Sequence, residues 1–122
     1  MQLKDNLYTI LEREGEMPQV NYQLKLNPSC FIYQAHFPGE PITPGVCIVQ
    51  MGKELLEELL QTSLTLTKVK NVKFLSVLTP EDDIVTFTVT KLMVGEEVKA
   101  QMVVSTHKGV KAKLSISLKK RQ

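Results

Sequence analysis

A histidine opens a stretch rich in proline and glycine, and a helix-forming segment follows directly. Three prolines and two glycines stand in the ten residues after His36. Proline fixes the backbone angle φ and glycine permits unusual values, so residues 36–46 are expected to hold one rigid shape. A rigid loop that ends at a helix N-terminus directs backbone N–H groups and the positive dipole end at whatever lies in front of it. An imidazole base beside fixed N–H donors suits chemistry on a carbonyl compound.

The segment from about Val46 to Gln61 carries the pattern of a long helix, in which only Gly52 is a poor helix former. Its apolar face comprises Ile48, Val49, Gly52, Leu55, Leu56, Leu59 and Leu60, and its polar face comprises Gln50, Lys53, Glu54, Glu57, Glu58 and Gln61. The wide apolar face suits a helix wrapped by a curved sheet. Gly52 indicates close approach of a neighbouring backbone, and the polar face is expected to be solvated.

The rest of the chain reads mostly as strands separated by turns. Alternating or β-rich runs predict strands over residues 7–11, 20–26, 64–77, 85–90, 98–105 and 111–119. The order is two strands, the loop, the long helix and four further strands. This order predicts an α+β fold in which an antiparallel sheet packs on one helix. With 122 residues, the chain is expected to form a single domain over residues 1–122.

Composition excludes several classes of function. A net charge of +2 gives no support for binding nucleic acid or a membrane surface, and the apolar runs are too short to span a bilayer. The N-terminus lacks the continuous apolar stretch of a signal peptide. Cys30 and Cys47 form no metal-binding or disulfide pattern by spacing, so we expect reduced thiols, no metal and a cytoplasmic protein. Cys47 is expected to be a small buried side chain.

The loop and the start of the helix resemble those of the 3-hydroxyacyl-[acyl-carrier-protein] dehydratases of bacterial type II fatty acid synthesis. The motif of that family reads His-Phe-Pro-Gly-x-Pro-x-x-Pro-Gly-Val, and residues 36–46 match every specified position. A looser match runs from Lys70 to Asp82, with Glu81 where glycine is usual. The resemblance spans roughly Tyr33 to Leu118. It implies the hot-dog fold, a curled antiparallel sheet around a long central helix.

The resemblance also implies an activity in fatty acid or related polyketide-type biosynthesis. The substrate would be a 3-hydroxyacyl thioester on an acyl carrier protein or coenzyme A, and loss of water would give a trans-2-enoyl thioester without a cofactor. By position, His36 would be the base, and a backbone N–H at Gly45 or Val46 would polarise the thioester carbonyl. The family's acid comes from the helix of the other subunit. The resemblance therefore implies a homodimer, a higher assembly of dimers, or a heterodimer with a related subunit.

One position departs from the family. The acid is expected 14 residues after the histidine, where this chain has Gln50. An amide cannot donate a proton as a general acid, and losing such a group typically costs about 10²–10⁴ in rate. Three outcomes stay open. Glu54, one helical turn on, could supply the acid, or a related partner subunit could supply it. Alternatively, the protein could be an acyl thioesterase or a non-catalytic acyl-thioester-binding subunit of a hetero-oligomer.

Other candidates carry weaker expectations. His107 lies beside a predicted turn and is expected at the surface, and the basic run from Lys119 to Arg121 is expected to be a solvated tail. Phe31, Ile48 and Phe74 could line an acyl tunnel, but sequence alone does not separate such residues from ordinary core.

Overall fold

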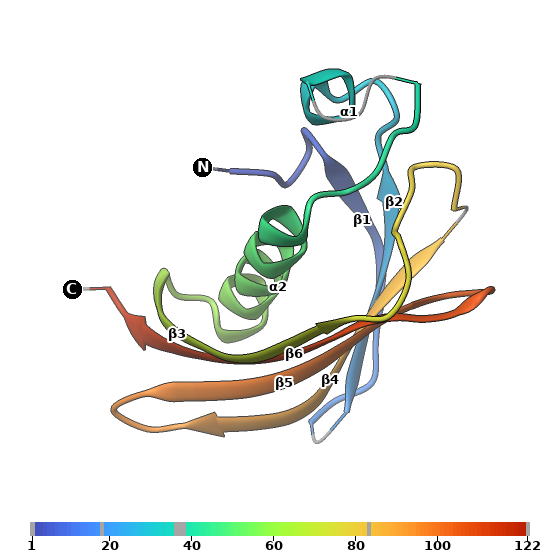
Figure 1. Ribbon diagram of the computed structural model, residues 1–122. Helices are drawn as coiled ribbons and strands as arrows, with labels where there is room; N and C mark the ends of the chain where they lie inside the picture. The colour runs from blue at the N-terminus through green and yellow to red at the C-terminus, as the bar shows by residue number, and fades with distance from the viewer. Residues whose placement is uncertain (1, 18, 36–38, 83, 122) are drawn as a thin grey trace.

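A curled sheet wraps around one long helix in the computed structural model, which describes residues 2–17, 19–35, 39–82 and 84–121 (Figure 1). The strands in these ranges are β1 (Tyr8–Glu14), β2 (Val20–Leu26), β3 (Leu64–Phe74), β4 (Val85–Val94), β5 (Val98–Thr106) and β6 (Gly109–Lys120). They form one antiparallel sheet in the order β1-β2-β4-β5-β6-β3. Helix α1 (Phe31–Ala35) precedes helix α2 (Gly45–Leu60), and α2 lies across the concave face of the sheet.

The strands follow the alternation that predicted them. In β4, the side chains of Val85, Phe87 and Val89 are fully buried, while the threonines between them are partly exposed. Because successive side chains of a strand point to opposite faces, this pattern places the apolar face toward α2. The strand predicted over residues 64–77 ends at Phe74. Beyond it, the N–H groups of Leu75 and Ser76 both donate to the carbonyl of Lys111, so the chain leaves the regular ladder there.

Helix α2 matches the prediction to within one residue at each end. The buried side chains of Met51, Leu55 and Leu56 fill the space between it and the sheet. The expectation for Gly52 is wrong in one respect, because its close neighbours are side chains rather than backbone. A Cβ atom there would lie 3.2 Å from the sulfur of Met102 and 3.3 Å from a methyl carbon of Leu114. Within the described residues, no helix has both the length and the apolarity needed to cross a membrane.

The short helix α1 was not predicted. It has five residues, with no acidic residue in its first turn and no basic residue in its last, so it lacks the usual charge signals at helix ends. The phenol of Tyr33 is buried and lies 2.8 Å from the hydroxyl of Thr43. Burial raises the pKa of Tyr33 to about 12. This hydrogen bond joins α1 to the segment that leads into α2.

The polar face of α2 is only partly solvated, because some of its glutamates bond to neighbouring strands, which corrects the expectation from periodicity. Glu57 accepts a hydrogen bond of 2.8 Å from the N–H of Leu64 at the start of β3. Glu58 accepts a hydrogen bond from the phenol of Tyr22 on β2 and lies 3.6 Å from the guanidinium of Arg13 on β1. Glutamates on this face therefore fix the helix against three strands.

Candidate active site

The predicted base, His36, lies outside the described residues, as do Phe37 and Pro38. The structure describes the chain on both sides of them. Helix α1 ends at Ala35, and the chain continues from Gly39, whose φ of +91° is one that L side chains rarely adopt. This agrees with the expectation that a glycine of the loop takes an unusual backbone angle. Residues 40–44 then lead directly into α2.

The predicted oxyanion donors stand at the first turn of α2. The carbonyl of Pro44, the N-cap residue, accepts hydrogen bonds from the N–H groups of Cys47 at 3.0 Å and Ile48 at 3.2 Å. The N–H groups of Gly45 and Val46 come before this first helical hydrogen bond. Groups at this position have no partner inside a helix and lie at its positive end. They suit an oxygen that gains negative charge during a reaction.

An aromatic ring lies directly over the start of the helix. A Cβ atom added to Gly45 would lie 2.6 Å from the ring of Phe74, which is closer than real Cβ contacts come. Glycine is therefore required here for the ring to keep its place. A cavity of about 370 Å³ lies beside this contact, between residues 42–45 and Ile48 on one side and residues 74–78 on the other. The exposed N-terminal turn of α2 thus borders a mainly apolar hollow.

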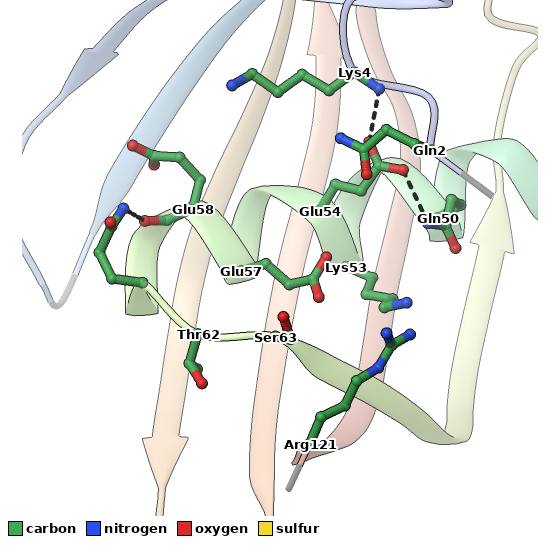
Figure 2. Close-up of a pocket in the computed structure, with 11 residues that line it drawn as sticks. Gln2, Lys4, Gln50, Lys53, Glu54, Glu57, Glu58, Thr62, Ser63 and Arg121 are labelled. Carbon is green, nitrogen blue, oxygen red and sulfur yellow. Dashed lines mark hydrogen bonds between the residues drawn. The ribbon is translucent and has the colours of Figure 1, made fainter.

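Gln50 lines a different hollow. It belongs to a polar groove of about 590 Å³ between the outer face of α2, the N-terminal segment and Arg121 near the C-terminus (Figure 2). Gln50 comes five positions after Gly45, which places the two residues about 7.5 Å apart along the helix axis and on different sides of it. In the described part of one chain, the predicted carbonyl-binding turn and the predicted acid position line two different cavities.

Glu54 lies at the centre of a set of hydrogen bonds that the sequence did not reveal. Its side chain is buried, with 5% of the residue exposed. One carboxylate oxygen accepts from the N–H of Leu3 at 2.8 Å and from Gln50 Nε2 at 2.9 Å. The other accepts from the N–H of Lys4 at 2.8 Å and from the phenol of Tyr8 at 2.9 Å. Burial and the nearby charge of Glu54 hold the pKa of Tyr8 far above its usual value.

This arrangement anchors the N-terminal segment and β1 to the helix. To act as a general acid, Glu54 would have to exchange one of these partners for a substrate. Apart from Gln50, the donors to Glu54 belong to Leu3, Lys4 and Tyr8, which lie 46 to 51 residues before Glu54 in the sequence. Two of these three donors are backbone N–H groups. No local pattern could have identified them.

The remaining candidate residues from the sequence differ in how far their side chains are buried. Ile48 is buried, whereas Phe74 is 53% exposed and Phe31 is 75% exposed. Cys47 is buried as predicted, and burial raises the pKa of its thiol. His107 is exposed at the turn between β5 and β6, also as predicted. Among the described residues, no group of three His, Cys, Asp or Glu side chains is arranged to hold a metal ion.

A curled antiparallel sheet around a long central helix defines the hot-dog fold, and solved structures of this class superpose on the chain. The dehydratase heterocomplex ApeI:P from Xenorhabdus doucetiae matches with a TM-score of 0.69 and 20% identity, over 91% of this chain and 96% of the other. An uncharacterized protein from Erwinia carotovora subsp. atroseptica matches with a TM-score of 0.71 and 20% identity, over 93% of this chain and 97% of the other. Protein yhdA from Lactococcus lactis, described as a candidate thioesterase, matches with a TM-score of 0.66 and 10% identity, over 98% of this chain and 97% of the other.

The sequence itself identifies the family. Residues 12–116 match the ApeI-like family, described as ApeI dehydratase, so this chain belongs to the ApeI-like dehydratases. No curated protein matches the sequence at a significant level. The predicted hot-dog fold is confirmed, and the predicted kinship with dehydratases is confirmed at the level of this family.

Proposed function

We propose that this chain is a subunit of a hydro-lyase that converts 3-hydroxyacyl thioesters to trans-2-enoyl thioesters. The acyl group would be carried by an acyl carrier protein or coenzyme A, in fatty acid or related polyketide-type biosynthesis in the cytoplasm. The observation that carries this proposal is the hollow of about 370 Å³ beside the first N–H groups of α2. It offers apolar walls for an acyl chain next to donors for a thioester oxygen, in a member of a dehydratase family.

The proposed roles follow from what the elimination requires. His36 takes the proton from C2, and the N–H of Gly45 or Val46 stabilises the thioester oxygen as it gains enolate character. The C3 hydroxyl leaves as water, and a double bond forms between C2 and C3. Because Gln50 has no proton to give, the imidazolium of His36 returns the C2 proton to the leaving hydroxyl, and the base is regenerated. No electron acceptor is needed. Gln50 binds the hydroxyl by a hydrogen bond but cannot protonate it, so we expect a rate about 10²–10⁴ below that of a site with a carboxylic acid.

A second subunit is part of the proposal. Strand β3 lies at one edge of the described sheet and carries exposed apolar side chains. An exposed edge strand is a site where another chain can pair. Further exposed apolar residues lie near the start of α2, including Val46 at 71% and Leu75 at 56%. A partner covering this region would bring its own α2 toward the hollow at Gly45. Gln50 would then serve the site of the neighbouring chain, in a homodimer, an assembly of dimers or a heterodimer with a related subunit.

A paired assay on short 3-hydroxyacyl and acyl thioesters tests this function. Enoyl absorbance reports dehydration, and a thiol reagent reports hydrolysis. We expect enoyl product without free thiol. Because Gln50 stands where the acid is expected, a second candidate function, that of an acyl thioesterase, stays open. Release of free thiol would identify it. If neither product forms while a thioester still binds, the chain is a non-catalytic subunit that needs a partner, and the proposed activity of this chain alone is wrong.

A further inference from the structure

The outer side of the sheet, which points away from α2, carries positive charge without acidic residues. Strands β3, β4, β5 and β6 contain no aspartate or glutamate. Their exposed lysines on this side, here called the lysine face, are Lys68, Lys70, Lys73, Lys91, Lys99 and Lys113. Among the described residues, none of these lysines forms an ion pair with a carboxylate. The overall charge of +2 therefore conceals a strongly basic surface.

The strand register shows that these lysines share one side of the sheet. Lys68 on β3 lies opposite Ser117 on β6, and Ser117 lies opposite Lys99 on β5. Residues directly opposite each other in neighbouring strands point to the same side, and the alternate rows are buried beneath α2 (Figure 1). Lys73 and Lys113 are also directly opposite, and like charges in that arrangement destabilise a strand pair. The fold gives no reason for this cluster, which favours a role in binding.

Two hollows open on the lysine face. Their volumes are about 230 and 380 Å³, and they share Lys70, Gln101 and Ser115. Each hollow is lined by three lysines together with hydroxyl and amide side chains, and no carboxylate of the described residues lines either of them. Ammonium, hydroxyl and amide groups all donate hydrogen bonds to anions. The hollows therefore suit the acidic side chains of a partner.

One end of the lysine face lies close to the proposed thioester site. Lys73 and Phe74 are the last two residues of β3, so their side chains point to opposite sides of the sheet. Lys73 lines one of the hollows on the lysine face, whereas Phe74 lines the cavity beside Gly45. A partner on the lysine face would thus contact the end of β3, next to the mouth of that cavity.

We infer that the lysine face docks an acidic protein, namely the carrier that brings the acyl thioester to the cavity beside Gly45. This inference rests on the proposed function and selects a carrier protein over coenzyme A as the bearer of the substrate. Lysines spread over four strands match a partner with many carboxylates, whereas coenzyme A carries only a few phosphate charges. Complementary charge of this kind accelerates encounter and adds specificity, and its effect weakens as salt rises.

The make-up of the lysine face disfavours two other polyanions. It has no arginine and no aromatic side chain, since Phe74 and Phe87 lie on the other side of the sheet. Surfaces that bind nucleic acid commonly use such side chains to read bases or to stack on them. The lysine face is also the convex side of the curled sheet (Figure 1), so a flat membrane would contact only part of it. A folded protein of complementary shape has no such restriction.

Binding of a carrier without its acyl group tests the docking surface directly. The probe is an acyl carrier protein of bacterial type II fatty acid synthesis in its apo form, titrated by calorimetry. We expect the affinity to fall at least about tenfold between about 50 and about 300 mM NaCl, because salt screens exposed charges. At low salt, Lys70→Glu/Lys99→Glu should weaken binding by at least about tenfold. Lys25→Glu/Lys120→Glu makes the same change in net charge at exposed lysines outside the lysine face, so this matched control should stay within about threefold.

Two further probes test the choice of partner. Phosphatidylglycerol vesicles and a DNA duplex are titrated at the same salt concentrations. If either binds more tightly than the carrier and loses affinity in Lys70→Glu/Lys99→Glu, the lysine face serves that polyanion and the inference is wrong. Weaker binding of both probes than of the carrier supports the inference.

Turnover separates this inference from the proposed function. The same 3-hydroxyacyl group is offered on the carrier protein and on coenzyme A. In Lys70→Glu/Lys99→Glu, KM for the carrier-borne substrate should rise at least about tenfold with kcat unchanged, while both constants for the coenzyme A thioester stay within about threefold.

The outcomes distinguish the two claims. Equal affinity of the apo carrier for the wild type and for folded Lys70→Glu/Lys99→Glu would overturn the inference, and enoyl product from the coenzyme A thioester would leave the proposed function intact. Absence of enoyl product from both substrates, together with salt-dependent carrier binding that the variant loses, would overturn the proposed function and support the docking surface.

Discussion

Two turns of the same helix differ sharply in how the fold treats them. At the first turn of α2, Val46 is exposed and the leading N–H groups have no partner within the helix, beside an apolar hollow. Two and a half turns later, Glu54 is buried and both of its oxygens are saturated by four donors. The first turn is where we propose that a thioester oxygen binds. The later turn uses its capacity to hold the N-terminal segment and one amide in place.

The difference indicates that the first turn of α2 is suited to binding a ligand, whereas the turn that carries Glu54 is suited to holding the fold together. N–H groups without a partner inside their helix, next to an apolar surface, suit a ligand that brings both an oxygen and an acyl chain. A buried carboxylate with every acceptor position filled suits a part of the structure that must not move. Substitutions at the later turn should therefore change stability first, whereas substitutions at the first turn should change ligand binding first.

The largest expected effect comes from removing the anchor. Glu54→Ala leaves four donors without their acceptor, and we expect the free energy of unfolding to fall by about 3 kcal/mol. Urea denaturation followed by circular dichroism measures it. Glu12→Ala, an exposed glutamate on β1, is the control and should stay within about 0.5 kcal/mol. Similar losses in the two variants would contradict the central role of the buried carboxylate.

Local patterns predicted the elements but not this anchor. The alternation in β4 and the long apolar face of α2 depend on neighbouring residues in the sequence. The bounds of α2 were therefore predicted to within one residue, and the start of β4 was predicted correctly, although the strand runs four residues beyond its predicted end. The burial of Glu54 depends on Leu3, Lys4 and Tyr8, which approach only when the sheet has curled. Helical periodicity placed Glu54 on the polar face correctly, yet it could not show that another segment covers that face.

The candidate site was predictable to a similar extent. The Pro-Gly motif located the first turn of α2, because the effects of proline and glycine on the backbone angles can be predicted from the residue types alone. The ring of Phe74 over Gly45 comes from a strand 29 residues away, and its contact is a property of the packed fold. Ile48 and Phe74, which the sequence offered as possible tunnel residues, both line the apolar hollow, but the sequence alone did not separate them from ordinary core.

The next effect concerns pH at the anchored turn. Burial and the charge of Glu54 raise the pKa of Tyr8 in the folded state above its usual 10.0. Its contribution to stability is complete below that pH and is lost as pH rises through the folded pKa, at about 1.4 kcal/mol per pH unit. Tyr8→Phe removes one ionising group, so the fall in unfolding free energy between pH 9.5 and about 11 should be shallower than in the wild type. Identical slopes would mean that Tyr8 ionises freely in the fold.

A smaller effect on stability is expected at the first turn. Gly45→Ala forces the half-exposed ring of Phe74 aside, which should cost no more than about 1 kcal/mol in unfolding free energy, because the ring can rotate into solvent. Binding of an acyl thioester should weaken by about tenfold, since the displaced ring borders the hollow. The double variant Gly45→Ala/Phe74→Ala tests the mechanism. Without the ring the alanine has room, so additive losses in the double variant would contradict this packing account.

The smallest expected effect compares the buried thiol in the first turn of α2 with the partly exposed thiol just before α1. Cys47 is 4% exposed and burial raises its pKa, whereas Cys30 is partly exposed. At pH 8 the thiolate is the reactive form, so Cys30 should react with a thiol reagent at least about tenfold faster than Cys47 in the folded protein. Cys30→Ser and Cys47→Ser proteins would assign the two rates. A faster reaction at Cys47 would show that the buried side of the turn opens readily.

Enoyl formation from a 3-hydroxyacyl thioester in wild-type and His36→Ala proteins tests the central claim most directly. The proposal predicts measurable enoyl product from the wild type, a loss of at least about 10²-fold in His36→Ala, and an unchanged rate in His107→Ala, whose imidazole is exposed at the turn between β5 and β6. Equal rates in the wild type and His36→Ala would contradict the account, because the first turn of α2 would then have no base to work with.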